Sequence, residues 1–389
     1  MIVLEEPYIS EPLLDFLEES QVPVLRNNFS TLVFPQHNKL NILNEKEFIN
    51  QYHSSSGQSL YTVSEYALDW VYQTLQDEKL IMQISLLKDK AAFRKACNSM
   101  YSDLFLKEIP YANLFTFDLS KVRLPVILKP SIGFLSTGVY TIANRSDWEK
   151  ALTDIQGNFL KLSGTFPDTV VGNTQFILES YIHGQEFAID LYFLEKEPVI
   201  INIFEHPFTS SKDVSDRLYT TNKTLFDDYL CLFTEHIARL NQLLNLSNIP
   251  VHMELRVENG KIIPIEINPL RFAGLCLNEL HTHITGKHPL SYYFSRVRPD
   301  YDSYWKGKEN KTFFFTVIEK PEETRNMRLD MEKIQQEFSN ILEIRKVENP
   351  KLPIYAFIFS EMDNSNQAEI NHILHLDIND YLQKNEKEI

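Results

Sequence analysis

Alternation of apolar and polar residues predicts two adjacent strands over residues 251–257 and 261–269. Successive side chains of a strand point to opposite faces, so each strand has one apolar face and one polar face. Asn259-Gly260 lies between the strands and is typical of a hairpin turn. The apolar face of the second strand is expected to carry Ile263, Ile265 and Ile267. The polar positions of the hairpin are His252, Glu254, Arg256, Glu266 and Asn268.

The length of the turn decides which side chains lie opposite each other, because paired residues of a hairpin point the same way. A two-residue turn would place Glu254 opposite Ile265. A three-residue turn with a left-handed glycine bulge would place Glu254 opposite Glu266. In that register His252 lies opposite Asn268. Only the second register keeps the apolar and polar faces separate, so we expect the three-residue turn.

Two carboxylates that face each other in a hairpin indicate a bound cation. Their side chains would lie about 5 Å apart, and at that distance each raises the pKa of the other unless a cation lies between them. Glu254, Glu266 and Asn268 offer oxygen ligands, which suit Mg²⁺ or Mn²⁺, and substrate phosphates can complete the shell of Mg²⁺. The alternative is a solvated polar face on which Glu254 pairs with Arg256 or Arg271. The hairpin alone leaves both interpretations open.

The remaining patterns divide the chain into three parts. Over residues 1–83 strands alternate with helices, which predicts a small α/β domain, and this segment lacks the GxGxxG pattern of a dinucleotide fold. Residues 84–300 contain several apolar strands and one long amphipathic helix just before the hairpin. Residues 301–389 predict strand, helix, strand, strand and helix. The chain is therefore expected to combine α/β and α+β units.

Composition and charge narrow the classes of function. The chain has 389 residues, too many for a single core, and 43% of them are hydrophobic. Lys and Arg number 38 against 53 Asp and Glu, a net charge of −15 that argues against nucleic acid or an anionic membrane as partner. No membrane span or signal peptide is expected. Cys97, Cys231 and Cys276 lack CxxC spacing, which favours a cytoplasmic location and no zinc knuckle.

A lysine followed by a glycine-containing loop suggests a phosphate site. Lys129 ends an apolar strand, and the loop after it contains Gly133, Ser136, Thr137 and Gly138. Glycines let a backbone approach phosphate oxygens and offer N–H donors, while the lysine neutralises charge. The order differs from a P-loop, because here the lysine precedes the loop. An ordinary hairpin turn is the alternative for these residues on their own.

The segment 175–192 predicts a short hinge between two strands. Backbone groups of such a hinge can bind the edge of an adenine ring, and a nearby carboxylate can bind both ribose hydroxyls. A turn with two exposed glutamates is the alternative. The hinge positions are Glu179 at the end of the first strand, Ser180, Tyr181 and Ile182 in the crossing, and Glu186 at the start of the second strand.

In chain order, five segments resemble the ATP-grasp superfamily of ATP-dependent ligases. They are "DKAAFRK", "PVILKPSIGFLSTGV", "ILESYIHGQEF", "MELRVENG" and "IEIN", spread over about residues 84–275. The resemblance implies an ATP-grasp core over 84–300 with two lobes, about 84–180 and 181–300, that hold the nucleotide between their sheets. It further implies an N-terminal α/β domain over 1–83 and a small C-terminal α+β extension over 301–389.

The same resemblance implies roles for single residues. They are Lys90 and Lys129 at the ATP phosphates, Gly133 to Gly138 as a loop closing over them, Glu179 and Ser180 to Ile182 at adenine, Glu186 at ribose, and Glu254, Glu266 and Asn268 at Mg²⁺. One departure concerns Arg271. The family usually continues as EINPR, whereas this chain has EINPLR, so Arg271 comes one residue late and its role near the transferred phosphate is open.

Proteins of this superfamily typically activate a carboxylate as an acyl phosphate, which an amine then attacks. The resemblance therefore implies a carboxylate–amine ligase with small-molecule substrates, and a homodimer stays open. Arg271 and Arg217 are the candidate catalytic residues, and Lys212 with Arg217 could hold a carboxylate unless both belong to a solvated loop. The alternatives are a nucleotide-binding sensor or regulatory protein without turnover and a biotin-carboxylase-like carboxylase.

Overall fold

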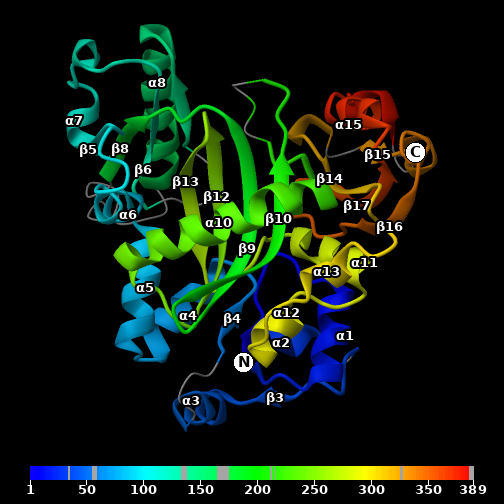
Figure 1. Cartoon of the computed structure of the whole chain (residues 1–389). Coiled ribbons are helices and arrows are strands. Elements are labelled where there is room, and N and C mark those ends of the chain that lie inside the picture. Colours follow the sequence, from blue (N-terminus) through cyan, green and yellow to red (C-terminus); the bar gives the residue numbers. More distant parts are fainter. Residues whose placement is uncertain are drawn as a thin grey trace.

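The computed structural model describes residues 1–33, 36–54, 59–132, 138–163, 175–210, 213, 215–324 and 327–384. Two four-stranded sheets, one eight-stranded sheet and a two-stranded ribbon organise these residues, with helices packed around the sheets (Figure 1). This mixture confirms the predicted fold class. None of the helices within the described ranges has both the length and the apolar character needed to cross a bilayer.

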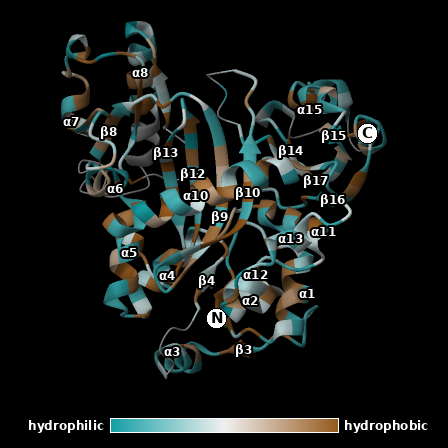
Figure 2. Cartoon of the chain, viewed as in Figure 1, coloured by the Kyte–Doolittle hydropathy of each residue, from teal (hydrophilic) through white to brown (hydrophobic). Residues whose placement is uncertain are grey.

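The N-terminal domain is a parallel sheet with the strand order β3-β2-β1-β4. Its helix α1 begins where the Ser10 hydroxyl accepts a hydrogen bond from the N–H of Leu13, which caps the first turn. Helix α3 at the edge of the domain is mostly hydrophilic (Figure 2) and buries only Phe48. The elements are β1 (Ile2–Val3), α1 (Glu11–Ser20), β2 (Val24–Leu25), α2 (Asn28–Val33), β3 (Ile42–Leu43), α3 (Glu45–Ser54), β4 (Tyr61–Thr62) and α4 (Tyr66–Thr74).

A small antiparallel sheet follows, with the strand order β5-β8-β6-β7. One of its faces packs on helix α8, where Leu128 and Leu178 join a core with Trp148. Because side chains alternate along a strand, Lys129 and Glu179 lie on the opposite face. The elements are β5 (Leu106–Pro110), α7 (Tyr111–Leu114), η1 (Leu119–Lys121), β6 (Val126–Pro130), β7 (Tyr140–Ile142), α8 (Arg145–Ser163) and β8 (Gln175–Ser180).

The eight-stranded sheet is the centre of the molecule and has the order β13-β12-β9-β10-β11-β14-β17-β16. Helix α10 (Lys223–Leu244) crosses it and packs on β10, and its Phe233 and Ile237 are fully buried. Three strands from the C-terminal segment extend this sheet beyond β11. The strands are β9 (Gln185–Leu194), β10 (Glu197–His206), β11 (Leu218–Asn222), β12 (Pro250–Glu258), β13 (Lys261–Pro269), β14 (Lys311–Glu319), β16 (Ile341–Lys346) and β17 (Ile354–Asp363).

Shorter elements connect the sheets. Asp89 has an extended backbone, which ends α5 (Glu78–Lys88), and its carboxylate caps α6 (Lys90–Ala96). The other elements are η2 (Leu277–Glu279), α11 (Leu280–Thr285), α12 (Leu290–Ser295), α13 (Tyr301–Tyr304), η3 (Glu322–Thr324), β15 (Met327–Leu329), α14 (Met331–Gln335), α15 (Gln367–Leu374), η4 (Ile378–Tyr381) and β18 (Leu382–Lys384).

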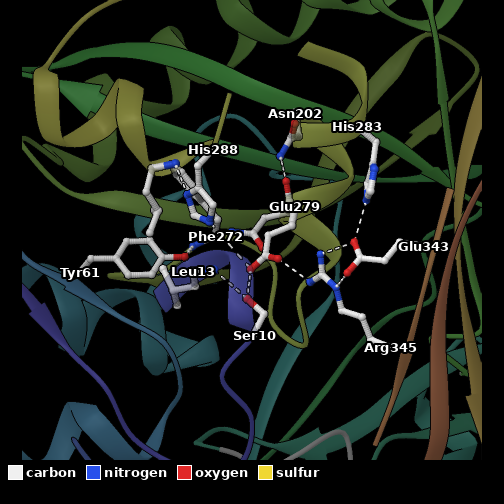
Figure 3. A network of polar contacts seen from close by, with 12 residues as sticks. Ser10, Leu13, Tyr61, Asn202, Phe272, Glu279, His283, His288, Glu343 and Arg345 are labelled. Atoms are coloured by element: carbon white, nitrogen blue, oxygen red, sulfur yellow. Dashed lines mark hydrogen bonds and ion pairs between the residues drawn. The ribbon is translucent and has the colours of Figure 1, made fainter. Parts of the chain in front are cut away.

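Glu279 joins three parts of the chain at a buried junction (Figure 3). Its carboxylate accepts a hydrogen bond from the Ser10 hydroxyl of the N-terminal domain at 2.5 Å and pairs with Arg345 of strand β16. His288 lies 3.8 Å away. Although burial alone would raise the pKa of Glu279, the nearby His288 and the charge of Arg345 hold it below its ordinary value. The junction fixes the chain shortly after strand β13.

Candidate active site

The hairpin of β12 and β13 has the predicted register at its polar residues. Glu254 lies opposite Glu266, and His252 lies opposite Asn268. The predicted three-residue turn is wrong. Glu258 pairs with Lys261, so the turn has two residues, Asn259 and Gly260, with φ of 51° and 77°. Two left-handed residues in succession match the twist of the strands, which is why Asn-Gly is favoured there.

A two-residue turn alone would not place Glu254 opposite Glu266. A bulge in β13 produces this register. The pairing shifts after Glu254, so that Leu255 lies opposite Pro264 and Ile265 is left over. Arg94 of helix α6 stabilises the bulge, because its guanidinium donates to the carbonyls of Pro264 at 2.5 Å and Ile265 at 3.4 Å. The bulge also corrects the expected apolar face, since Ile263 lies opposite Arg256 and not on the face of Ile267.

The two carboxylates of the hairpin differ in their electrostatic surroundings. Burial raises the pKa of Glu254 well above its usual range, and the charge of Glu266 raises it further. Burial has the same effect on Glu266, but the nearby charges of Lys90, Lys129 and Lys88 outweigh it and lower the pKa of this carboxyl. Lys90 donates to Glu266 at 3.3 Å. Glu266 is therefore readily ionised, whereas ionisation of Glu254 is unfavourable. A bound cation would stabilise the ionised form of Glu254.

The donor set suits a hard divalent cation that also binds phosphate. Glu254, Glu266 and Asn268 all lie on one face of the hairpin, with two carboxylates and one amide as oxygen donors. Within the described residues, no group of three or more His, Cys, Asp or Glu side chains could hold a metal ion. Three oxygen-bearing side chains leave most of an octahedral shell to other ligands. The residues fit Mg²⁺ that arrives with a nucleotide.

Lys129 and Glu179 form a buried ion pair on the small sheet. The Nζ of Lys129 lies 2.5 Å from one oxygen of Glu179, and the Nε of Arg94 lies 2.7 Å from the other. All three side chains are at most 7% exposed. Burial would raise the pKa of Glu179, but Arg94 and Lys129 together lower it to about 2. Arg94 thereby links the small sheet to the bulge of β13.

The start of helix α6 connects to the strand end that carries Lys129. The N–H of Lys90 donates to the carbonyl of Ser131 at 2.9 Å, and the Ser131 hydroxyl donates to Asp89 at 2.6 Å. This holds Lys90 and Lys129 near each other, both acting on Glu266. Of the predicted phosphate loop, Gly138 has a φ of 95°. Gly133, Ser136 and Thr137 lie outside the described residues.

The hinge between the sheets is formed by Ser180, Tyr181 and Ile182. The N–H of Ser180 donates to Phe105, and the carbonyl of Ile182 accepts from Arg256 at 2.6 Å. Among the described residues, the N–H of Ile182 has no hydrogen-bond partner, so it is available as a donor to a ligand.

Glu186, predicted at ribose, is already paired on two sides. Arg256 lies 2.7 Å from one carboxylate oxygen and His206 lies 3.3 Å from the other. Burial opposes ionisation, yet the hydrogen bond from His206 and the charge of Arg256 lower the pKa of this carboxyl. The guanidinium of Arg256 also lies over the ring of Tyr181, 5.4 Å from its centre. Each carboxylate oxygen of Glu186 therefore has one partner among the described residues and keeps further acceptor capacity.

The two predicted catalytic arginines lie in different places. Arg271 follows β13, its charge acts on Glu254, and its Nη2 lies 3.4 Å from Glu65. Arg217 instead donates to the carbonyl of Leu374 at 3.1 Å and pairs with Glu319 at 3.7 Å. In the described part of the chain no contact joins Arg217 to the hairpin carboxylates, so the structure gives it a partner in the C-terminal segment. Lys212 lies outside the described residues.

Residues 122–279 match a known family, that of the ATP-grasp domain. Over this range the chain is similar to an ATP-grasp domain. No curated protein sequence was found to match the chain. The matched range holds the Lys129 strand, the hinge and the hairpin, but not Lys90 or the N-terminal domain.

Solved structures of ATP-grasp proteins resemble the whole chain. An L-amino acid ligase from Bacillus licheniformis has a TM-score of 0.69 at 16% identity, covering 100% of this chain and 98% of that one. Biotin carboxylase of Campylobacter jejuni in a β-γ-ATP complex has a TM-score of 0.62 at 11% identity, and the match covers 99% of this chain and 91% of that one. Carboxyaminoimidazole ribonucleotide synthase of Aspergillus clavatus with ATP has a TM-score of 0.61 at 14% identity, and the match covers 96% of this chain and 97% of that one. These likenesses confirm the predicted ATP-grasp fold.

A cavity of about 420 Å³ lies beside the ATP-grasp hinge. Its lining comes from helix α6, strand β5 and the hinge, and includes Arg94, Asn98, Phe105, Ser180 and Ile182. The cavity therefore adjoins the residues predicted to bind adenine.

Sequence reasoning missed two residues that hold the ATP-grasp site together. Arg94 was part of a quoted motif, but nothing in its spacing showed that it would bridge Glu179 and β13. Asp190 is fully buried in the strand "EFAIDLYF" and accepts from the N–H of Ala273 at 2.7 Å and from His252 at 2.9 Å. A lone aspartate within an apolar strand is the available sign, because a buried carboxylate needs partners.

Proposed function

We propose that the protein is an ATP-dependent ligase that activates a carboxylate substrate as an acyl phosphate for attack by an amine, releasing ADP and phosphate. The observation that carries the proposal is the convergence of Lys90 and Lys129 on Glu266, opposite Glu254. Cations from helix α6 and the small sheet, with carboxylates from the large sheet, form the surroundings that a metal–triphosphate needs. The similar solved structures, an L-amino acid ligase among them, support this class.

In this proposal the lysines and the hairpin residues have separate roles. Lys90 and Lys129 neutralise the phosphates, while Glu254, Glu266 and Asn268 hold Mg²⁺, which would offset the charge that develops during phosphoryl transfer. Arg271 would stabilise the transferring group, since its charge lies close to Glu254. The free N–H of Ile182 would bind the adenine edge.

Calorimetric titration with a non-hydrolysable ATP analogue, AMP-PNP, tests the proposal. We expect Mg²⁺ and AMP-PNP to bind together and each to bind poorly alone, because the hairpin supplies only part of a metal shell. Glu266→Gln should weaken the Mg²⁺-dependent component while the protein stays folded, because the change removes a charge from a repelling pair. Tight Mg²⁺ binding without nucleotide, or AMP-PNP binding that ignores Mg²⁺, would contradict this site.

A biotin-carboxylase-like activity is the second candidate, because a biotin carboxylase is among the similar structures. Adding bicarbonate and free biotin to a phosphate-release assay distinguishes the two. A ligase would release phosphate only with a carboxylate and an amine, whereas a carboxylase would respond to bicarbonate with biotin. A cytoplasmic location remains our proposal, with Cys97, Cys231 and Cys276 all free.

A further inference from the structure

Glu65 of the N-terminal domain lies between two cations at the edge of the candidate site. Its carboxylate accepts from Lys88 at 2.5 Å and from the Nη2 of Arg271 at 3.4 Å. It precedes the first residue of helix α4 and makes no capping bond to that helix. Its side chain turns instead to the two cations, so its position is not explained by the helix.

Both of these cations act on the hairpin carboxylates. The charge of Lys88 lowers the pKa of Glu266, and that of Arg271 opposes the rise in the pKa of Glu254. Glu65 therefore connects the N-terminal domain to the positive edge of the proposed metal and phosphate site.

The same stretch of the N-terminal domain also holds the backbone around Arg271. The N–H of Thr62 donates to the carbonyl of Leu270 at 2.8 Å, and the N–H of Phe272 donates to the Tyr61 hydroxyl at 3.0 Å. Leu270 is the extra residue before Arg271, and it is buried with a left-handed φ of 62°. A buried leucine keeps this conformation only if its surroundings hold it there. These contacts bring the late arginine back to the site.

Arg271 still has an unused donor. One Nη donates to the carbonyl of Phe272 and the other to Glu65, while its Nε is buried without a hydrogen-bond partner among the described residues. A buried N–H without a partner is unfavourable by roughly 1–3 kcal/mol. A guanidinium binds a planar or tetrahedral oxyanion through neighbouring donors. The free Nε is therefore available to an anionic oxygen of a ligand.

We propose that Glu65 is a positioning residue: it fixes the guanidinium of Arg271 so that the Nε meets an anionic oxygen of the terminal phosphate. The inference rests on the proposed ligase function and adds the N-terminal domain to the site. Glu65 itself touches neither substrate nor nucleotide in this account. Its effect passes through Arg271.

Positioning and simple charge balance predict opposite results for Glu65. If Glu65 acted only through its charge, Glu65→Gln would make the site more positive and would strengthen the binding of an anionic ligand. Glu65→Asp would then change little, because the charge remains. If Glu65 positions Arg271, both variants release the guanidinium, since aspartate is shorter by one methylene group, and both weaken the binding of the terminal phosphate.

The experiment measures the affinities of the full-length protein for Mg²⁺–AMP-PNP and Mg²⁺–ADP by calorimetry. We expect Glu65→Asp and Glu65→Gln each to weaken AMP-PNP by about fivefold or more and to change ADP by less than about twofold. In an Arg271→Ala background the same changes at Glu65 should have no further effect, because the residue they act through is gone. Asp69→Asn, an exposed carboxylate on the same helix, is the matched control and should behave like the wild type.

Tighter AMP-PNP binding by Glu65→Gln, or unchanged binding by both variants, would overturn the positioning role. Equal losses of affinity for AMP-PNP and ADP would also overturn it, since they would indicate a general structural effect. A lowered melting temperature of the variants would reveal such an effect. A wild-type protein that binds neither nucleotide would instead overturn the proposed function, and the positioning role with it.

Discussion

At the scale of single residues, the paired Glu179 ties stability to pH. Its folded pKa of about 2 lies below the ordinary value of 4.5. The stabilisation is therefore complete above about pH 4.5 and is lost as the pH falls toward 2, and it amounts to about 3 kcal/mol. Glu179→Gln should lose at least this much at pH 7 and show a flatter acid limb in urea denaturation. Glu149→Gln is the control, because this carboxylate is 63% exposed and should change stability by less than about 1 kcal/mol. Equal losses at the two positions would contradict the buried pair.

Lys129 provides the second prediction at this scale. Lys129→Met should weaken AMP-PNP binding by at least about thirtyfold, since truncating a buried cation that faces a polyanion costs on the order of 2–5 kcal/mol. Lys150→Met on the exposed side of helix α8 should shift the affinity by less than about 1 kcal/mol. Calorimetric titration of both variants checks this. Similar affinities for the two would mean that Lys129 serves only to balance Glu179.

At the scale of elements, the turn into strand β9 depends on a glycine. Gly184 has a φ of 100°, and a Cβ there would lie 2.1 Å from the carbonyl oxygen of Val257. Gly184→Ala must therefore displace backbone and should destabilise the protein by more than about 2 kcal/mol. Gly157 in helix α8 has nothing within 4 Å of its Cβ position, so Gly157→Ala should stabilise by about 0.5–1 kcal/mol. Melting temperatures should move in opposite directions, and movement in the same direction would contradict the account.

The hairpin shows how far element-scale prediction reached. The facing of Glu254 and Glu266 followed from keeping apolar and polar faces apart, a requirement that acts within the two strands. The extra residue that sets this register was predicted to lie in the turn, but in the structure it lies in the bulge at Ile265. That bulge is supported by Arg94, which is 170 residues from Pro264 in the chain. A bond over such a distance leaves no trace in local periodicity.

Across the hairpin and helix α6, Arg94 should be needed for β13 to keep its bulge. Arg94→Met removes the donors to Pro264 and Ile265 and leaves Glu179 with Lys129 alone. We expect faster hydrogen exchange in β13 and a loss of about 3–5 kcal/mol, since a buried pair loses a partner. Arg145→Met, at an arginine that is 78% exposed, is the control. Unchanged exchange in β13 would show that the bulge does not need Arg94.

At the scale of the whole molecule, the Glu279 junction holds the N-terminal domain, the ATP-grasp region and strand β16 together (Figure 3). Arg345→Met would leave a buried carboxylate without its charged partner, which should cost about 3–5 kcal/mol. Arg328→Met, at an exposed arginine that donates to Gln383, is the control from the same segment. Hydrogen exchange near Ser10 should quicken only in the first variant. If it does not, the junction does not couple these parts.

The whole-molecule arrangement was predictable in part. The order of strands and helices and the matched motifs indicated the fold. How the N-terminal domain meets the site was not readable, because Tyr61, Thr62 and Glu65 reach the loop after β13 across about 200 positions of sequence. The joining of C-terminal strands to the large sheet depends on pairing between β11 and β14, which local alternation does not specify.

Product formation tests the central claim most directly. The wild-type protein is incubated with Mg²⁺–ATP and a panel of paired carboxylates and amines, and ADP and the joined product are quantified together by mass spectrometry. The account predicts that at least one pair yields ADP and an amide in equal amounts, and that Glu266→Gln yields neither. Mg²⁺-dependent nucleotide binding without ADP formation above background for any pair would contradict it and would favour a nucleotide-binding protein without turnover.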